Sequence, residues 1–265
     1  MKQIVVPTDF SASAENAMMY AGRLAQKIQG EVVLLHVFQI PVSMSEVPVL
    51  MISAEELKQN ADMGLHKASE MLLRAYPSLS IRTESRMGEV TEELNDLCEE
   101  IKPFLIVTGK HGAGGLERFF FGSTSLSIVR HTSTPVIVVP EKAGATEPRS
   151  VALAVGDQSD PIPQEKIRNF VETLGTSIHV IHVQPERSEP QEFGSPVEGL
   201  NATVKTIKDD EFLHGIQTYL QENSIDMLMI LPHRHSFLER LTIKTHTEEL
   251  LRKLDIPVVC IREEE

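Results

Sequence analysis

Hydrophobic positions along the chain alternate between short apolar runs and longer repeats at helical spacing. Residues 3–9 predict a strand, and residues 11–29 follow with apolar side chains on one helical face. Further strands are predicted at 32–38, 79–86, 104–108 and 136–139, with helices at 57–75, 90–101 and 124–130. Five uniformly apolar strands that alternate with four helices predict an α/β fold, in which a parallel sheet is covered on both faces.

The same pattern begins again after residue 150. Val151–Asp157 repeats the first strand, and Ser177–Val183 repeats the second strand down to its His-Val ending. Toward the ends of the two copies the sequences align without a gap at an offset of 122 residues, so that Pro135–Val138 matches Pro257–Cys260. This duplication predicts two tandem domains, residues 1–144 and 149–265, joined where Gly, Pro and charged residues cluster.

The second copy is shorter between its second and third strands. Residues 184–200 are rich in Pro, Glu, Ser and Gly and have no helical periodicity. An irregular loop is therefore predicted in place of a helix. This leaves one face of the second sheet to be covered by something else, and a further homodimer contact is the expected cover.

Composition and charge narrow the possible partners. The chain is 41% hydrophobic and 24% charged, and its longest apolar stretch, residues 32–38, is far shorter than the roughly 20 residues that cross a bilayer. The start of the sequence has no signal-peptide pattern, and the two cysteines have no disulfide or metal spacing. A formal charge of −13 repels phosphate backbones and anionic lipid. We expect a cytoplasmic protein that binds neither nucleic acid nor membranes.

The chemically most informative segment is a glycine-rich loop after the fourth strand. Gly109-Lys110-His111-Gly112 is followed by nine residues and then by Gly122-Ser123-Thr124-Ser125, which opens a helix. Glycines let backbone amides approach an anion, and a helix N-terminus adds free N–H groups and partial positive charge. Asp9 ends the first strand at the same sheet edge, where such sites lie. A simple turn is the alternative, because neither a Walker A motif nor a Rossmann fingerprint is present.

The spacing G-x2-G-x9-G-S, together with Pro-Thr-Asp-Phe-Ser at 7–11, resembles the ATP-binding branch of the universal stress protein family in tandem form. The resemblance implies two doubly wound open parallel five-stranded sheets of the adenine-nucleotide alpha-hydrolase type. It also implies ATP as ligand, with Mg²⁺ carried by the phosphates. Asp9 would contact the nucleoside and the Val37 backbone the adenine edge. The phosphates and ribose would be held by Gly109, Gly112, Gly122, Ser123 and Ser125. One departure is Pro103-Phe104, where the family usually has Asp-Leu.

The corresponding loop of the second copy has lost its glycines. The offset of 122 places Leu231, Arg234, Lys244 and Thr245 at the positions of Gly109, Gly112, Gly122 and Ser123. Bulky side chains then stand where backbone must approach phosphate, which predicts a site that no longer binds ATP. Altered binding of an anion or nucleotide, which Arg234 and Lys244 would attract by their charge, is the alternative.

The remaining polar residues are weaker candidates. Lys110 and His111 either contact phosphate or face solvent. His179 and His182 are three apart on a strand and point to opposite faces, and His233 and His235 flank Arg234 in a loop. The sequence contains no nucleophile with an adjacent base and no carboxylate or metal cluster with catalytic spacing.

These observations favour a binding protein over an enzyme. We expect a nucleotide-sensing stress protein that acts through binding and assembly. The alternatives are a slow ATPase or adenylyl-transferring enzyme, and a structural adaptor that nucleotide merely stabilises. The transfer chemistry is disfavoured because the Ser-Gly-Gly-x-Asp-Ser signature of the PP-loop synthetases is missing.

The duplication also predicts how the halves assemble. Single-copy family members are generally dimers, so the resemblance implies an internal pseudo-dimer. Its simplest form pairs the apolar edge strands 136–139 and 258–261, which would otherwise be left open. Proline at Val259 is then expected to separate the halves. A further homodimer contact and an unknown regulatory protein partner are also expected.

Overall fold

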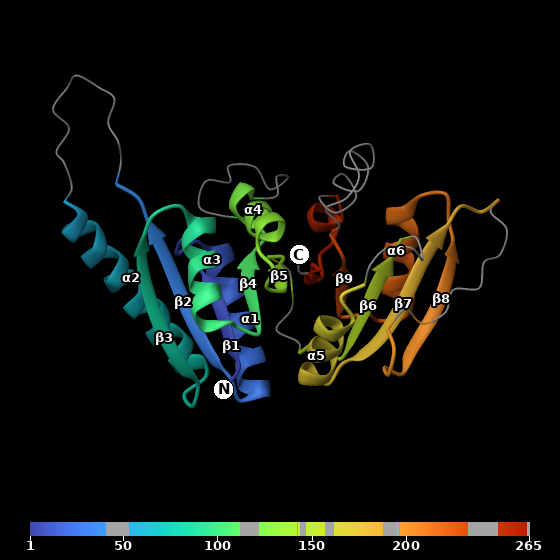
Figure 1. Ribbon diagram of the computed structural model, residues 1–265, viewed down its shortest axis with the longest axis horizontal. Helices are drawn as coiled ribbons and strands as arrows, with labels where there is room; N and C mark the ends of the chain where they lie inside the picture. Colours follow the sequence, from blue (N-terminus) through green and yellow to red (C-terminus); the bar gives the residue numbers. More distant parts are fainter. Residues whose placement is uncertain are drawn as a thin grey trace, which may run out of the picture.

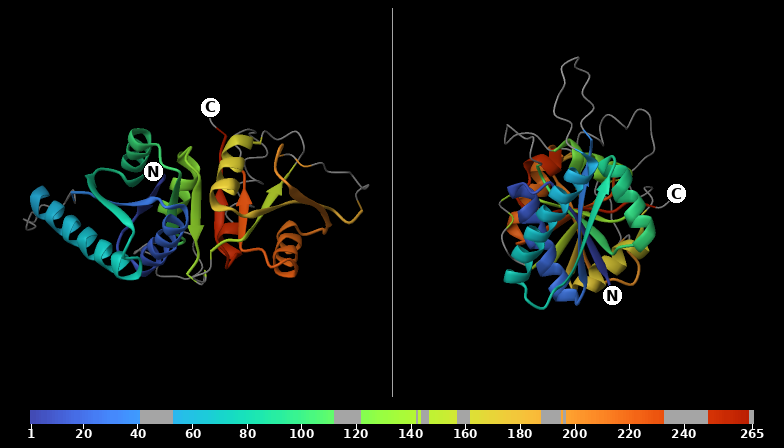
Figure 2. Two further views of the ribbon diagram at one scale, coloured as in Figure 1. Left: turned by 90° about the horizontal axis from the view of Figure 1, so that it is seen from below. Right: turned by 90° about the vertical axis from the view of Figure 1, so that its left-hand side faces the viewer.

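The computed structural model of the chain has a ten-stranded sheet in its described residues, with helices on both faces (Figure 1, Figure 2). The structure describes residues 1–40, 53–111, 122–141, 143, 147–156, 162–187, 195, 197–232 and 249–263. The strands are β1 (Gln3–Pro7), β2 (Glu31–Phe38), β3 (Ser80–Met87), β4 (Leu105–Gly109), β5 (Val136–Val139), β6 (Ser150–Val155), β7 (Ser177–Gln184), β8 (Ala202–Lys208), β9 (Met227–Ile230) and β10 (Val258–Cys260).

The four helices of the first half lie close to the ranges that the periodicity predicts. The helices of the chain are α1 (Ala12–Ile28), α2 (Ala54–Ala75), α3 (Val90–Ile101), α4 (Ser123–His131), α5 (Gln164–Leu174) and α6 (Phe212–Glu222). Residues 249–253 are also helical and are named here the pre-β10 helix. Local caps explain two of the starts. The Ser11 side chain accepts a hydrogen bond from the Ala14 amide at the start of α1, and Ser53 forms a capping box with Glu56 at the start of α2.

The strand order is β3-β2-β1-β4-β5-β10-β9-β6-β7-β8. The strands within each half are parallel, and the halves meet where β5 and β10 pair antiparallel. The register confirms the offset of 122, because Ile106 pairs with Val136 in the first half and Leu228 with Val258 in the second. The two doubly wound sheets and their internal pseudo-dimer, predicted from the duplication and the family resemblance, are thus confirmed.

The junction between β5 and β10 corrects one expectation from the sequence. Val259 lies opposite Ile137, but the hydrogen bonds from Leu228 N to Pro257 O and from Ile261 N to Ile230 O place the odd-numbered peptide groups of this strand toward β9. The peptide groups of Val258 and Cys260 therefore face β5. Proline at Val259 therefore removes a backbone hydrogen bond within the second half. The amides that donate across the junction between the halves remain.

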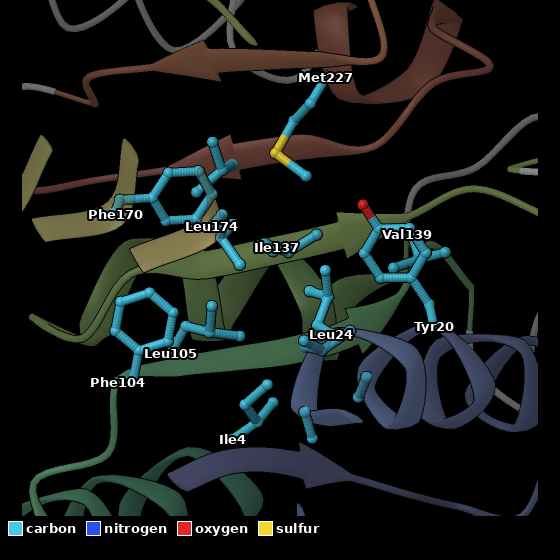
Figure 3. Close-up of a cluster of buried hydrophobic side chains, with 14 of the residues drawn as sticks. Ile4, Tyr20, Leu24, Phe104, Leu105, Ile137, Val139, Phe170, Leu174 and Met227 are labelled. Carbon is cyan, nitrogen blue, oxygen red and sulfur yellow. The ribbon is translucent and has the colours of Figure 1, made fainter. Parts of the chain in front are cut away.

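The hydrophobic core consists of two layers, one on each face of the sheet. One layer lies under α1, α2 and α5, and the other under α3, α4, α6 and the pre-β10 helix. Each layer contains residues of both halves. Figure 3 shows Ile137 and Val139 of β5 among Tyr20 and Leu24 of α1 and Phe170, Leu174 and Met227 of the second half. The sheet pairing is therefore reinforced by apolar packing across the junction.

The shortened crossover of the second half lies between β7 and β8. Its described residues contain no helix, as predicted. Val197 is buried there and packs into the same layer as α5, with Leu200 partly buried beside it. These two side chains thus belong to the core layer on which α2 packs in the first half.

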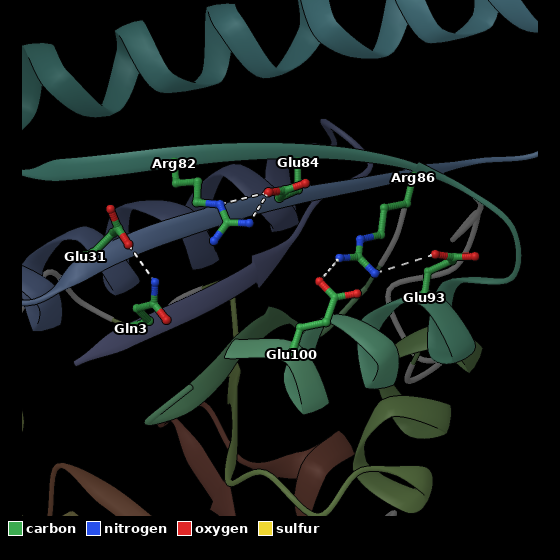
Figure 4. Close-up of polar contacts among 7 residues, drawn as sticks. All are labelled: Gln3, Glu31, Arg82, Glu84, Arg86, Glu93 and Glu100. Atoms are coloured by element: carbon green, nitrogen blue, oxygen red, sulfur yellow. Dashed lines mark hydrogen bonds and ion pairs between the residues drawn. The ribbon is translucent and has the colours of Figure 1, made fainter. Parts of the chain in front are cut away.

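The outer strand β3 carries charged side chains along the open edge of the sheet (Figure 4). Arg82 binds Glu84 on the same strand, and Arg86 Nη2 donates to Glu100 Oε2 of α3 at 2.6 Å. The bond from Arg86 lowers the pKa of the Glu100 carboxyl. Charged pairs on an edge strand disfavour pairing with a further strand.

Candidate functional site

The candidate site lies where β1, β2 and β4 end. β1 is paired with β2 on one side and with β4 on the other. The order in which the strands are added to the sheet therefore reverses at β1. In open α/β sheets this change of direction leaves a crevice beyond the carboxyl ends of the strands. Asp9 follows β1, Val37 lies near the end of β2, and Gly109 ends β4. The fold therefore brings these three predicted residues to one edge.

Asp9 braces the turn between β1 and α1. It is exposed, and its Oδ1 accepts a hydrogen bond from the Ser11 amide at 3.0 Å. The intervening Phe10 has a positive φ of 62°, and its ring stacks on His36 with 4.4 Å between the ring centroids. A carboxylate can accept several further hydrogen bonds. The Asp9 carboxylate therefore stabilises the turn between β1 and α1 and lies exposed at the sheet edge.

His36 and Phe10 join the ends of β1 and β2. His36 Nδ1 lies 2.7 Å from Thr8 O, which holds the imidazole in place. Gly64 of α2 faces the Phe10 ring, and a Cβ there would lie 2.5 Å from the nearest ring carbon. Phe10 was not among the residues predicted from the sequence to form the site. Its place inside the Pro-Thr-Asp-Phe-Ser motif was the available signal.

Val37 presents its backbone rather than its side chain to the edge. Thr8 N donates to Leu35 O at 2.8 Å, whereas Gly88 N donates to Phe38 O at 3.1 Å. Odd-numbered residues of β2 therefore face β1 and even-numbered ones face β3. β1 has ended at Pro7, opposite Leu35, so within the described chain no strand pairs with the Val37 peptide groups on that side. The Val37 side chain is partly buried and packs against the core layer under α3, α4 and α6.

Gly109 is required by packing against α1. A Cβ at this position would lie 2.5 Å from Ser13 Oγ and 2.6 Å from Ser13 O. The His111 amide donates to Ser13 Oγ at 3.2 Å, which ties the loop after β4 to the first turn of α1. Ser125 is only 5% exposed, and its hydroxyl donates to Gly109 O at 2.8 Å. Since a serine has one hydroxyl proton, Ser125 holds the loop in place in this structure.

Lys110 differs from both sequence interpretations, which were phosphate contact and solvent exposure. The residue is 7% exposed. Its ammonium crosses to the second half, where it donates to Arg252 O at 2.5 Å and Leu254 O at 3.2 Å. These carbonyls lie at the C-terminal end of the pre-β10 helix, where helix carbonyls lack intrahelical partners. A buried ammonium needs such acceptors, and the sequence alone does not place them near residue 110.

The N-terminus of α4 completes the edge. Gly122 is its N-cap, and the Gly122 amide donates to Lys110 O at 3.0 Å, which closes the base of the loop. No described side chain caps this end, and its first turn carries no acidic residue. Ser123 is exposed. An uncapped helix N-terminus without nearby carboxylates favours an anion. Gly112 lies outside the described residues.

The second half keeps part of this arrangement. His182 Nδ1 lies 3.2 Å from Val155 O, which reproduces the contact of His36 with Thr8. At the position of Gly109, Leu231 packs partly buried against the core. His179 bonds with the Tyr219 hydroxyl on the opposite sheet face, as its spacing from His182 predicted. The remaining loop residues, namely Asp157, His233, Arg234, His235, Lys244 and Thr245, lie outside the described residues.

A cleft of about 920 Å³ lies at the other edge of the first-half sheet, where β1, β4 and β5 begin. It is lined by Gln3, Phe104 and Pro135 of the first half and by Lys166 and Arg262 of the second. None of the predicted nucleotide-site residues lines it. This cleft is a feature of the junction between the halves.

The cysteines do not offer a reactive nucleophile. Burial raises the pKa of the Cys98 thiol to about 11, and full burial raises the pKa of Cys260 further. Among the residues described, no group of three or more His, Cys, Asp or Glu side chains could hold a metal ion. No helix in the described ranges is long and apolar enough to span a membrane.

Comparison with known proteins agrees with this architecture. The universal stress protein family profile matches residues 1–140. A universal stress protein of Synechocystis is 26% identical over 300 residues and covers 99% of this chain and 100% of its own length. One from Methanocaldococcus jannaschii is 30% identical over 140 residues, which is 52% of this chain and 81% of that protein. The crystal structure of a universal stress protein from Archaeoglobus fulgidus shares the fold, with a TM-score of 0.68 at 17% identity and coverage of 99% and 98%. The chain therefore belongs to the universal stress protein family, in a tandem form.

Proposed function

We propose that the chain binds one molecule of ATP at the carboxyl edge of the first-half sheet and acts as a nucleotide-sensing stress-response module. The observation that carries the proposal is the meeting of three ligand-binding features at one edge. These are the strand-free peptide groups of Val37, the exposed carboxylate of Asp9 and the uncapped N-terminus of α4.

Each feature suits a different part of the nucleotide. The N–H and C=O of one peptide can bond the donor and acceptor on the adenine edge, which fits the Val37 backbone. A carboxylate accepts hydrogen bonds from ribose hydroxyls, which fits Asp9. The first-turn amides of α4, beside Gly122 and Ser123, suit the phosphates. Mg²⁺ would be held mainly by the phosphates, since this cation usually keeps waters and phosphate ligands.

A single site is proposed because the halves differ at the end of the fourth strand. Gly109 leaves room for the close contact between α1 and β4, whereas Leu231 fills the corresponding position of the second half with a side chain. The sequence also places Lys244 where the first half has Gly122. We therefore expect the second half to contribute to assembly rather than to ATP binding.

Binding rather than hydrolysis is the proposed activity. At the described edge, the His36 ring nitrogen is engaged by Thr8 O, and the Ser125 hydroxyl is engaged by Gly109 O. A general base must reach the proton that it removes, and His36 Nδ1 and the Ser125 hydroxyl already bond to carbonyl oxygens of the chain. Release of ADP at a steady rate from purified protein would favour the slow ATPase that is the alternative.

Titration calorimetry of the purified chain with MgATP tests the proposal. One site per chain is expected, and the Gly122→Lys variant should bind at least about 100-fold more weakly, because losing two charge-assisted hydrogen bonds costs roughly 3 to 6 kcal/mol. Gly122 has φ −61°, so the new side chain fits the backbone without strain. Asn201→Lys, which adds the same charge at an exposed position of the second half, serves as control. Absence of millimolar affinity in the parent would disprove the proposal.

The proposal includes a homodimer and a regulatory protein partner whose contact depends on nucleotide. The internal pairing already uses β5 and β10, so a homodimer would have to use another surface. Light scattering with and without MgATP measures this. A particle with the mass of one chain under both conditions would remove the homodimer from the proposal.

A further inference from the structure

Lys110 links the proposed phosphate end of the first half to the second half. Its amide donates to Val139 O at 3.0 Å, and its carbonyl accepts from the Gly122 amide at 3.0 Å. Its buried ammonium donates to Arg252 O and Leu254 O. One residue therefore touches the end of β5, the N-terminus of α4 and the pre-β10 helix of the other half. Any ligand that fixes the loop base also fixes this contact.

The opposite end of α4 carries a second link between the halves. Arg262 follows β10, is 9% exposed, and donates from Nη1 to Arg130 O in the last turn of α4. Lys166 of α5 donates to Ser133 O at 2.9 Å and to Arg262 O at 3.0 Å, which joins the same region from a third element. Helix α4 thus begins at the proposed phosphate site, and a carbonyl of its last turn accepts a hydrogen bond from a cationic side chain of the second half.

The two links are reciprocal without being copies of each other. Arg130 and Arg252 occupy equivalent positions at the offset of 122, so each half offers the carbonyl end of the same helix to a cation of the other. The cations are not equivalent, because Pro232 stands at the position of Lys110 and Pro140 at that of Arg262. Each link satisfies helix carbonyls that otherwise lack partners, and places a positive charge at the negative end of a helix dipole.

We propose that Lys110 and α4 couple nucleotide occupancy to the association of the two halves, so that bound nucleotide holds β5 and β10 together more tightly. This inference rests on the proposed function. An anion at the N-terminus of α4 and Arg262 at its C-terminus both stabilise the same nine-residue helix, so each favours the other. Such coupling is reciprocal: the factor by which bound nucleotide favours the paired junction equals the factor by which the paired junction favours nucleotide binding.

Hydrogen exchange of the full chain, with and without MgATP, measures the coupling. The reporters are the amides of Val258 and Cys260, which face β5, and β7 at the far side of the second half is the internal reference. In the parent, MgATP should slow exchange at the reporters roughly fivefold or more beyond any change in β7. A factor of about five is at the lower end of ordinary allosteric coupling. Calorimetry on the same samples establishes whether nucleotide is bound.

Two variants remove one link each. Lys110→Met keeps the length of the side chain but removes the donors, and Arg262→Met removes the link at the other end of α4. In both we expect faster exchange at the reporters without nucleotide and loss of the MgATP effect at saturation. Lys67→Met, at an exposed position of α2, should behave as the parent. The second variant keeps the test valid if the first fails to fold.

The outcomes separate the two proposals. If calorimetry shows binding but the reporters exchange at an unchanged rate, the coupling is disproved and the proposed function stands. If both variants retain the full MgATP effect, the route through Lys110 and α4 is wrong. If the parent binds no ATP, the proposed function fails and this inference falls with it.

Discussion

Replacing Gly109 with alanine tests why a glycine ends β4. The new Cβ would lie 2.5 Å from Ser13 Oγ, 2.6 Å from Ser13 O and 2.8 Å from Ser13 C. Two of these three atoms are backbone, so rotating the serine side chain cannot relieve the contact. The first turn of α1 must instead move away from β4, and α1 lies on a closely packed layer of the core.

The expected cost is that of overpacking, about 1 to 3 kcal/mol in the free energy of unfolding. For a chain of this size, 2 kcal/mol corresponds to a fall of roughly 4 to 8 °C in the melting temperature. Urea unfolding followed by circular dichroism measures the change. Adding Ser13→Ala should restore only a small part of the loss, because the two backbone contacts remain.

Gly215→Ala is the matched control, since the nearest atoms to its Cβ would be side-chain carbons at 3.1 to 3.3 Å. We expect its stability to stay within about 1 kcal/mol of the parent, because the residue lies in α6 and alanine favours a helix. If Gly109→Ala is as stable as the parent and loses only ATP affinity, the glycine serves the ligand alone and the packing argument is wrong.

Two further predictions concern the junction and the thiols. Cys260→Pro should allow the halves to separate after limited proteolysis near residue 147, because it removes a hydrogen-bond donor that faces Val136. Val259→Pro should instead weaken the pairing of β9 with β10 inside the second half. Equal behaviour of the two variants would refute the assigned strand faces. Neither Cys98 nor Cys260 should react with an alkylating reagent at pH 8 before the protein unfolds. A pKa of about 11 leaves roughly 0.1% of the Cys98 thiol ionised at this pH, and the Cys260 thiol is buried. Mass spectrometry detects the adducts, and rapid native labelling of either thiol would contradict this.

The elements and their order were predictable because they depend on local signals. Apolar periodicity located the strands and helices, and the repeated His-Val ending revealed the duplication. The pairing of β5 with β10 followed from edge strands that are too apolar to remain open. Likewise the gathering of Asp9, Val37 and Gly109 at one edge follows from parallel topology, which places every carboxyl end on the same side.

What the sequence left undecided depends on contacts between distant residues. Gly109 could be required either for ligand binding or for the close packing of Ser13, and a glycine in a motif is compatible with both roles. The distances from Gly109 to Ser13 distinguish them, and these depend on the tertiary structure. The direction of the Lys110 side chain is set by acceptors 142 residues away, at Arg252, which no local pattern indicates. The strand face of Val259 depends on a register that hydrogen bonds to β9 fix.

The sequence by itself therefore determined the tandem α/β architecture, the family and the edge at which a nucleotide site would lie. The architecture and the edge follow from hydrophobic spacing and strand polarity, which are properties of each segment alone. The family follows from the resemblance carried by the glycine spacing and the Pro-Thr-Asp-Phe-Ser motif. Only the tertiary structure decided that Lys110 binds the other half and that α4 joins the proposed phosphate end to Arg262. The reason is physical: a buried cation goes to the nearest unsatisfied carbonyls, and packing alone determines which carbonyls those are.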